Sequence, residues 1–220
     1  MSAARFLEKL LDGADVEWMP LSKFAEVFDG THQTPKYTEN GIPFVSVQNI
    51  RDLNGTVKYI SIEDFQKYKC KPRKYDLFMT RIGDIGTCAL VDNDKPLAYY
   101  VTLALIRADR EVALAEYLLH FIQSSFGKAA LYKRTLVNAV PKKINLGEIG
   151  KLLIPIPCPD DPEKSLAIQR EIVRILDNFT ELTTELTAEL TDELTDELTC
   201  LLYTSPSPRD RTRSRMPSSA

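Results

Sequence analysis

A leucine recurs every four residues near the end of the chain, and this spacing limits the possible folds more than any other feature. The five leucines from Leu182 to Leu198 are separated only by Thr, Glu, Asp and Ala. With the apolar residues before them, they predict one helix over residues 165–199, about 50 Å long at a rise of 1.5 Å per residue. A four-residue period exceeds the 3.6-residue helical turn, so the leucine stripe drifts around the helix instead of following a left-handed coiled coil.

The repeat segment is acidic and offers nothing of its own to cover the leucines. Residues 180–199 hold seven Asp or Glu and no Lys or Arg. An apolar stripe of this length needs a partner helix. An amphipathic surface helix that packs on its own domain is the plainer alternative. The residues expected to pair with another helix are Ile172, Leu176, Phe179, Leu182, Leu186, Leu190 and Leu194.

The body of the chain, residues 16–157, mixes strand and helix patterns. Short apolar runs between turn residues predict strands over 41–50, 57–60, 99–105 and 146–157, and two strands around a glycine turn over 76–91. Residues 16–21 lead into the apolar segment over 24–28. Helical spacing predicts helices over 61–68, 113–132 and the N-terminal residues 1–15, whereas residues 24–28 fit a strand or a short helix. The expected fold class is α+β: a mixed α/β domain followed by a long coiled-coil-type helix over residues 158–199.

Residues 200–220 differ in composition from everything before them. They hold four Arg, three Pro and five Ser and little that could pack, which is typical of a disordered basic arm. The stretch Cys200–Asp210 resembles the translation of a transposase-type sequencing adapter, and Arg213–Ala220 resembles the far end of that adapter. We therefore expect residues 200–220 to be a disordered, adapter-derived segment, and the natural protein to continue differently past Thr199.

Composition argues against several classes of protein. No apolar run approaches the roughly 20 residues of a membrane span, and acids interrupt the N-terminal segment where a signal peptide would be apolar. The four cysteines lie far apart with no Cys-x-x-Cys pair, which argues against a zinc site or a disulfide framework. We therefore expect a cytoplasmic protein with no metal site and no membrane contact.

Patterns that would support catalysis are missing from the sequence. The glycine turn Gly83–Gly86 has neither the order of a dinucleotide loop nor a Gly-Lys-Ser/Thr ending. His120 fits a structural place on a helix, and His32 lies in a turn-rich loop where it is either solvated or touches a ligand. The acids Glu63-Asp64 and Lys67 loosely suggest a nuclease set but share an expected surface helix. The sequence therefore predicts no catalytic site.

Basic residues are placed more suggestively. Residues 16–157 hold nineteen Lys and Arg against fifteen Asp and Glu. A dense run over residues 67–74 is interleaved with tyrosine, and the pairs Lys133-Arg134 and Lys142-Lys143 add two further basic sites. Such groups neutralise DNA phosphates, while Arg, Gln and Asn contact base edges. A solvated face is the plainer interpretation of one lysine run, but basic groups spread over three loops favour nucleic acid.

The order of these motifs resembles the specificity subunit of type I restriction–modification systems. The similarity runs over roughly residues 5–199, and the order and spacing of the motifs are more specific than any one of them. The segments that carry it are Val16–Leu21, Gly41–Val45, Arg81–Gly86, Pro141–Asn145 before Ile154–Pro157, and the helix entry Gln169–Asp177.

The resemblance implies a subunit without a catalytic site. In that family two target-recognition domains are each followed by a conserved helix, and the two helices pair antiparallel. The subunit reads a split DNA sequence and scaffolds methyltransferase (M) subunits and ATP-driven restriction (R) subunits. S-adenosylmethionine, ATP and Mg are accordingly expected on the partner subunits and not on this chain. The chain matches one recognition domain and one helix, so the second recognition half is expected in cis, or in trans from another half-length subunit.

We therefore expect residues 16–157 to bind double-stranded DNA and the helix to act as a spacer. Each four-residue unit between Thr180 and Thr199 adds about 6 Å, under two base-pair steps of about 3.4 Å, so the number of units is expected to set the gap between the half-sites. Two alternatives remain: a coiled-coil adaptor that binds only proteins, and a DNA methyltransferase or nuclease in its own right. The candidate phosphate or groove contacts are Lys69, Lys71, Arg73, Lys74, Arg81, Lys142 and Lys143, and the candidate base-reading residues are Gln48 and Asn49.

Overall fold

A four-stranded antiparallel sheet forms the centre of the α/β domain in a computed structural model that describes residues 13–204. Its strand order is β2 (Ala25–Asp29), β9 (Leu103–Ala108), β6 (Leu77–Thr80) and β7 (Cys88–Leu90). The expected pair of strands around the glycine turn is confirmed as β6 and β7, and residues 24–28 fall largely in strand β2. Most of the expected N-terminal helix over residues 1–15 lies outside the described residues.

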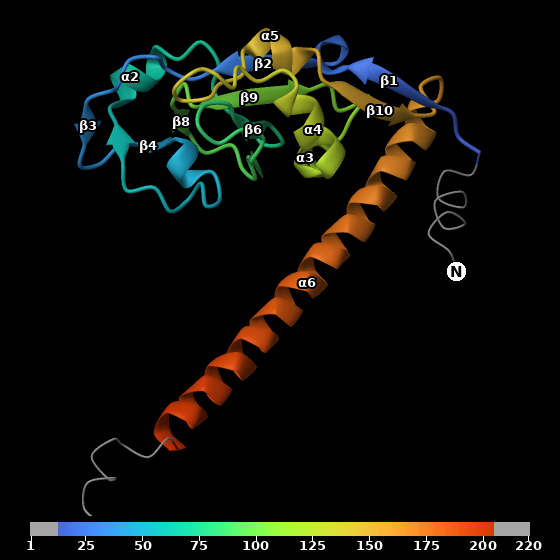
Figure 1. The fold of residues 1–220 in the computed structure, drawn as a ribbon. Helices are drawn as coiled ribbons and strands as arrows, with labels where there is room; N and C mark the ends of the chain where they lie inside the picture. The colour runs from blue at the N-terminus through green and yellow to red at the C-terminus, as the bar shows by residue number, and fades with distance from the viewer. Residues whose placement is uncertain (1–12, 205–220) are drawn as a thin grey trace, which may run out of the picture. The chain divides into compact units, whose positions relative to one another are not determined.

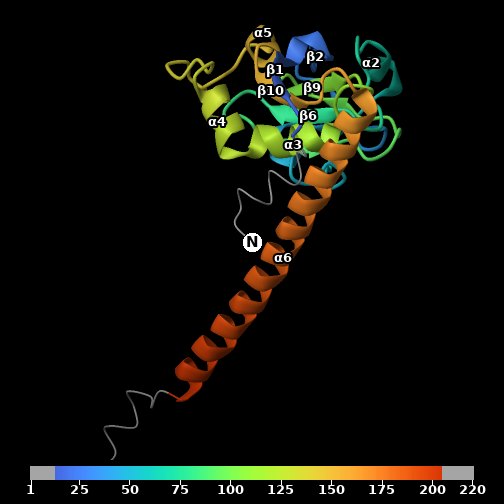
Figure 2. The same cartoon turned by 90° about the vertical axis from the view of Figure 1, so that its right-hand side faces the viewer.

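Alternate residues of the central sheet enter two different cores. Leu77, Met79 and Ile106 belong to one core with buried side chains of helix α3 (Ala115–Gln123). Phe78 and Leu105 belong to a second core on the other side. The period of two along a strand explains this division, because successive side chains point to opposite faces. Figure 2 shows α3 and α4 (Ser125–Tyr132) beside the central sheet.

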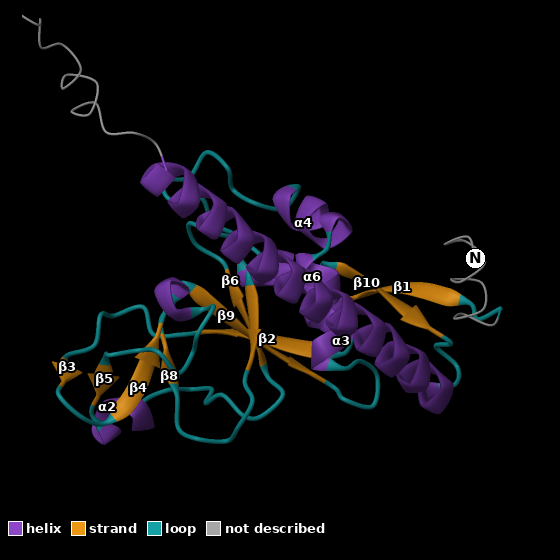
Figure 3. Ribbon diagram, turned by 90° about the horizontal axis from the view of Figure 1, so that it is seen from below, coloured by secondary structure: helices purple, strands orange, loops and turns teal. Residues whose placement is uncertain are grey.

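Two smaller sheets flank the central one, and Figure 3 shows them at opposite ends of the domain. One is a strand pair, in which β1 (Val16–Pro20) runs antiparallel to β10 (Leu153–Pro157). The other has the order β3 (Tyr37–Thr38), β5 (Tyr59–Ile60), β4 (Ile42–Val45) and β8 (Ala98–Tyr99). The short helix α2 (Ile62–Gln66) follows β5, and its start at Ser61 is as expected, since the Ser61 hydroxyl accepts a hydrogen bond from the Asp64 backbone N–H. The α+β class is thus confirmed.

The single helix expected over residues 113–132 is wrong, because the structure has two helices, α3 and α4. Ser124 leaves helical geometry (φ −65°, ψ 164°), and its hydroxyl accepts a hydrogen bond from the Gly127 backbone N–H at 3.1 Å. This N-terminal cap starts a new helix. Gly127 also fits where other residues do not, since a β-carbon there would lie 2.2 Å from the carbonyl oxygen of Phe121. The helical spacing of apolar residues continued through the break and concealed it.

Two expected strands also divide. The strand over 99–105 is split between β8 and β9, which belong to different sheets, with a turn at residues 101–102 between them. The strand over 146–157 is confirmed only from Leu153 onward, because residues Leu146–Gly150 form the short helix α5. Turn geometry at these places depends on distant partners that the local pattern does not reveal.

Helix α6 (Pro162–Thr204) is one uninterrupted helix (Figure 1). Asp161 caps its start, because its carboxylate accepts a hydrogen bond from the Lys164 backbone N–H at 3.0 Å. Residues up to Arg174 belong to the compact unit of the α/β domain, and the helix from Ile175 onward forms a second unit. The helix continues past Thr199 to Thr204, so residues 200–204 are helical where disorder was expected; extending an existing helix carries no nucleation cost. Residues 205–220 lie outside the described residues.

The helix is firmly seated where it leaves the domain. The Gln169 side chain is fully buried, and its Oε1 accepts a hydrogen bond from the Leu114 backbone N–H at 3.0 Å. Its Nε2 donates to the carbonyl oxygen of Val112 at 2.9 Å and to the hydroxyl of Ser165 at 3.1 Å. These bonds fix the first turns of α6 to the segment before α3. Within the described residues, no helix is both long and apolar enough to cross a membrane.

Candidate nucleic-acid interface

Backbone alternation exposes the basic side chains that follow α2. Cys70 and Pro72 are buried in the domain, and the residues beside them face solvent. The side chains exposed in this way are Lys69, Lys71 and Arg73, and Lys74 directly after them is exposed as well. The structure therefore places four of the predicted phosphate contacts on one exposed segment, residues 69–74.

A buried ion pair that sequence reasoning missed holds this segment. Arg107 on β9 donates from Nη2 to Asp76 Oδ2 at 2.6 Å and from Nε to Asp76 Oδ1 at 2.9 Å. The same Nη2 donates to the carbonyl oxygen of Lys71 at 2.9 Å, and Asp76 Oδ2 accepts from the Arg73 backbone N–H at 2.8 Å. The hydrogen bond to Asp76 raises the pKa of Arg107 above its ordinary value. The basic segment is thus presented on a preorganised backbone.

Arg81, predicted to contact DNA, is instead a structural residue at the centre of several loops. It is only 8 % exposed. Its Nε donates to the carbonyl oxygen of Ile144 at 3.2 Å, and its Nη1 donates to that of Val101 at 3.2 Å. Asp29 Oδ2 lies 3.9 Å from Nη1, and burial lowers the pKa of Arg81. Because the guanidinium is buried and its Nε and Nη1 already donate to carbonyl oxygens, Arg81 does not offer the exposed phosphate contact that was predicted, and that role is corrected.

Lys142 and Lys143 are exposed next to Arg81. The Gly83 backbone N–H donates to the carbonyl oxygen of Lys142 at 2.8 Å, and the Ile144 N–H donates to that of Arg81 at 3.0 Å. Lys143 forms isolated β-bridges to Ile82 and Leu136. The structure thus joins the glycine turn and the lysine pair, which lie about 60 residues apart in the sequence.

Gln48 and Asn49 are not on the expected strand over 41–50. Strand β4 ends at Val45, and residues Val47–Asn49 form a 3₁₀ turn in which Gln48 is exposed and Asn49 half-buried. The strand stops because the Val47 N–H donates to the hydroxyl of Thr102 at 3.2 Å instead of to a neighbouring strand. Thr102 in turn accepts the Arg81 N–H at 2.9 Å through its carbonyl oxygen. The structure therefore places both predicted base-reading residues in a turn beside the loops around Arg81.

The turn-rich loop over residues 29–36 reaches the same place. The Thr31 N–H donates to the carbonyl oxygen of Tyr99 at 3.2 Å, and the Thr31 carbonyl oxygen accepts from Val101 at 3.0 Å. His32 is exposed, and its Nε2 lies 2.6 Å from Asp29 Oδ2. Asp29 and His32 are three residues apart in a turn-rich segment, and this short separation was the signal in the sequence for the contact. Residues 29–36, 46–51, 81–86 and 142–145 are called the loop cluster below.

The predicted pairing face of α6 divides between two roles. Ile172 packs against the core of the α/β domain, so its predicted role in pairing with another helix is corrected. Leu176 and Phe179 are exposed, as are the leucines of the repeat. The repeat leucines Leu182, Leu186, Leu190, Leu194 and Leu198 are 51–61 % exposed. On the helix from Ile175 onward, the apolar stripe is therefore open to a partner.

The described residues contain no group of three His, Cys, Asp or Glu that could hold a metal ion. Burial raises the pKa of the thiols of Cys70 and Cys88, which keeps them protonated at neutral pH. A protonated, buried thiol is a poor nucleophile. The side chains exposed at the interface described above include lysines, the Gln48 amide and the His32 imidazole.

Comparison with known proteins finds similar sequences over most of the chain. The family model described as "Type I restriction modification DNA specificity domain" matches residues 14–196. The chain is 36 % identical over 198 residues to the type I restriction enzyme EcoprrI specificity subunit of Escherichia coli, which covers 83 % of this chain and 47 % of that protein. It is 35 % identical over 190 residues to the EcoR124I/EcoR124II specificity subunit of Escherichia coli, covering 83 % of this chain and 43 % of the relative. The chain thus spans about half the length of these relatives.

Solved structures share the fold. The HsdS subunit from Thermoanaerobacter tengcongensis superposes with a TM-score of 0.57 at 19 % identity, over 84 % of this chain and 45 % of that one. A chain from a study of complex assembly and conformational transition of the type I R-M system superposes with a TM-score of 0.61 at 18 % identity, over 90 % of this chain and 50 % of that one. At these identities the likeness concerns the fold alone.

Proposed function

Because this chain belongs to the family of type I restriction–modification DNA specificity domains, we propose that it reads one half of a split DNA target. It is a recognition subunit domain rather than an enzyme in its own right. The observation that carries the proposal is the loop cluster. Gln48 and Asn49, the glycine turn and the pair Lys142-Lys143 are distant in sequence and meet around Arg81. Amides suit base edges and lysines suit phosphates, so the cluster carries both kinds of contact.

The segment 69–74 supplies a second set of phosphate contacts in this proposal. Its lysines are exposed, and the Arg107–Asp76 pair holds its backbone. Phosphate contacts fix the register of a protein on the duplex but carry no sequence information themselves. The lysines therefore set affinity, and residues of the loop cluster set sequence preference.

Helix α6 is proposed to join this half to the rest of a complex. Its exposed leucine stripe supports pairing with the helix of a second recognition half, supplied in cis or by another half-length subunit in trans. The partners proposed for the assembled complex are M subunits, which carry S-adenosylmethionine, and R subunits, which carry ATP and Mg. The protein works in the cytoplasm, where its DNA target is.

The exposed stripe also supports an adaptor that binds only proteins, and DNA titrations separate the two functions. The full chain is titrated with a mixed-sequence 30-base-pair duplex at several salt concentrations. We expect log affinity to fall linearly with log salt, with a slope near −0.9 per phosphate contacted. The variant Lys142→Glu/Lys143→Glu should lower the slope by about two contacts. The matched control Lys23→Glu, next to the β1–β10 pair, should leave it unchanged. A chain with no salt-sensitive affinity would be an adaptor.

A further inference from the structure

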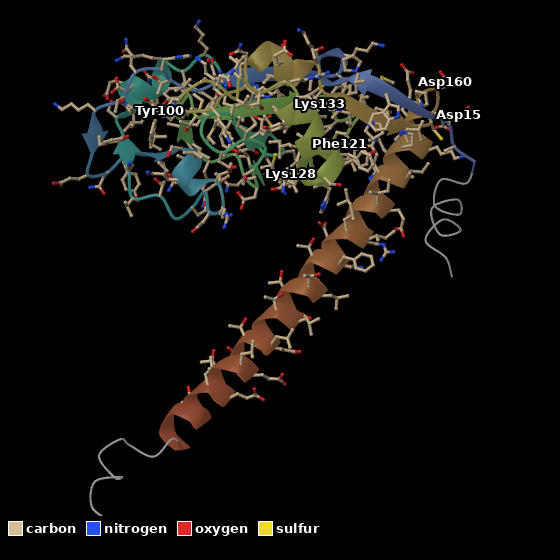
Figure 4. The ribbon with its side chains drawn as sticks, in the orientation of Figure 1. Asp15, Tyr100, Phe121, Lys128, Lys133 and Asp160 are labelled. Carbon is tan, nitrogen blue, oxygen red and sulfur yellow. The ribbon has the colours of Figure 1, made fainter. Side chains whose placement is uncertain are left out.

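The chain from α4 to the loop cluster carries basic residues and no acidic ones. Between Glu116 and Glu148 there is no acidic residue, and the bases in this stretch are Lys128, Lys133, Arg134, Lys142 and Lys143. Figure 4 labels Lys128 on α4 and Lys133 just after it. The basic pairs Lys133-Arg134 and Lys142-Lys143 were identified from the sequence, but the absence of acidic residues around them was not. A surface made by this stretch is complementary to an anionic partner.

The loop over residues 136–143 carries exposed apolar side chains from its neck to its tip. Val140 is 99 % exposed, and Leu136 and Val137 are also among the exposed large apolar residues. Single exposed apolar side chains are ordinary on protein surfaces. Three of them within five residues, on a loop that ends in two exposed lysines, are a distinct feature.

The loop is closed at its neck. The Leu136 backbone N–H donates to the carbonyl oxygen of Lys143 at 2.8 Å, and the two residues form a β-bridge. Within the loop, the Ala139 N–H donates to the Leu136 carbonyl oxygen at 3.2 Å. The neck also contacts the glycine turn through the bridge between Lys143 and Ile82. The tip thus projects from the loop cluster on a hydrogen-bonded base, with its lysines at that base.

We propose that residues 137–141 enter a groove of the DNA and that Val140 contacts bases there. This inference rests on the proposed function and adds a specificity-determining residue to it. Apolar side chains contact the thymine methyl group in the major groove, and apolar wedges pack between base steps in the minor groove. In either groove Lys142 and Lys143 lie at the neck, where the phosphates that line the groove would be. The acid-free interval favours DNA over a protein surface as the occupant.

In the test, the full chain selects the sequences that it binds from a random DNA duplex library. Each variant is then compared with the unmodified chain in its selected sequence motif and in its affinity for the selected duplex. Val140→Ala removes two methyl groups, and a loss of about fivefold to tenfold in affinity for the selected sequence is expected. Val140→Asp should also erase preference at one or two positions of the motif. Val57 is a matched control, because it is 85 % exposed on another loop; Val57→Asp should change neither the motif nor the affinity.

The outcomes separate this inference from the proposed function. If the unmodified chain selects no motif and shows no salt-sensitive binding, the proposed function itself fails. If it selects a motif that Val140→Asp leaves unchanged at full affinity, DNA recognition stands and the role of Val140 is refuted. If Val140→Asp leaves the motif intact but weakens co-purification with the M subunits, the tip is a protein contact and the inference is likewise overturned. Circular dichroism of each variant checks that the fold is retained.

Discussion

The buried pair of Arg107 and Asp76 gives the sharpest test of how the basic segment is held. The Asp76 side chain is 4 % exposed and that of Arg107 is 23 % exposed. Asp76 accepts three hydrogen bonds, two from Arg107 and one from the backbone of Arg73. Asp76→Asn keeps the shape but removes the charge, and leaves the guanidinium without its carboxylate. Breaking a buried pair on one side typically costs 3–5 kcal/mol, and the partial exposure of Arg107 places the expected loss near 3 kcal/mol.

The assays are urea unfolding and thermal unfolding of the full chain, each followed by circular dichroism. A loss of about 3 kcal/mol should lower the melting temperature by roughly 6–12 °C in a protein of this size. The exposed pair Lys151–Glu148, at 2.6 Å, is the matched control, and Lys151→Met should cost less than about 1 kcal/mol. In a double-mutant cycle with Arg107→Met, the two changes should couple by about 2 kcal/mol. If Asp76→Asn costs no more than the control, the pair does not hold the segment.

Three further predictions follow from buried groups and from the repeat. Gln169→Leu leaves the half-buried backbone N–H of Leu114 and carbonyl of Val112 without their partner, so it should cost about 1–3 kcal/mol in urea unfolding; a loss under about 0.5 kcal/mol would contradict the seating of α6. Burial raises the pKa of the Cys88 thiol, so less of it is thiolate at pH 8. Iodoacetamide should therefore label Cys88 far more slowly than the half-exposed Cys158. Equal labelling rates, measured by mass spectrometry, would refute this. Deleting one four-residue unit between Thr180 and Thr199 in the assembled complex should shorten the gap in the methylated target, and an unchanged gap would exclude the spacer as a ruler.

Local signals predicted those elements that local contacts stabilise. The cap at Ser61, the strands around Gly83–Gly86 and the long α6 each depend on residues close in sequence. The break at Ser124 was missed because the apolar spacing of α3 continues into α4. A serine with a glycine three residues later was the available signal.

The sequence predicted which basic residues are exposed at the candidate site, but not which of its residues are buried or lie in turns. Lysine side chains are costly to bury, so their exposure followed from their chemistry. Arg81 is as basic as they are, yet it is buried because two carbonyl oxygens and Asp29 from distant segments surround it. Gln48 is not on a strand because β4 ends before it, where the Val47 N–H donates to the hydroxyl of Thr102, more than fifty residues away. Long-range partners of this kind are not visible in a local pattern.

The central claim is that this chain reads one half of a split DNA target, and an exchange of halves tests it most directly. Residues 14–196 would replace the matching half of the EcoprrI specificity subunit, and DNA methylation would be mapped across the genome of cells that carry the chimera with its M subunits. The account predicts a split motif in which one half is new and the other half is that of the parent. A motif identical to the parent's, or methylation without any split motif, would contradict it.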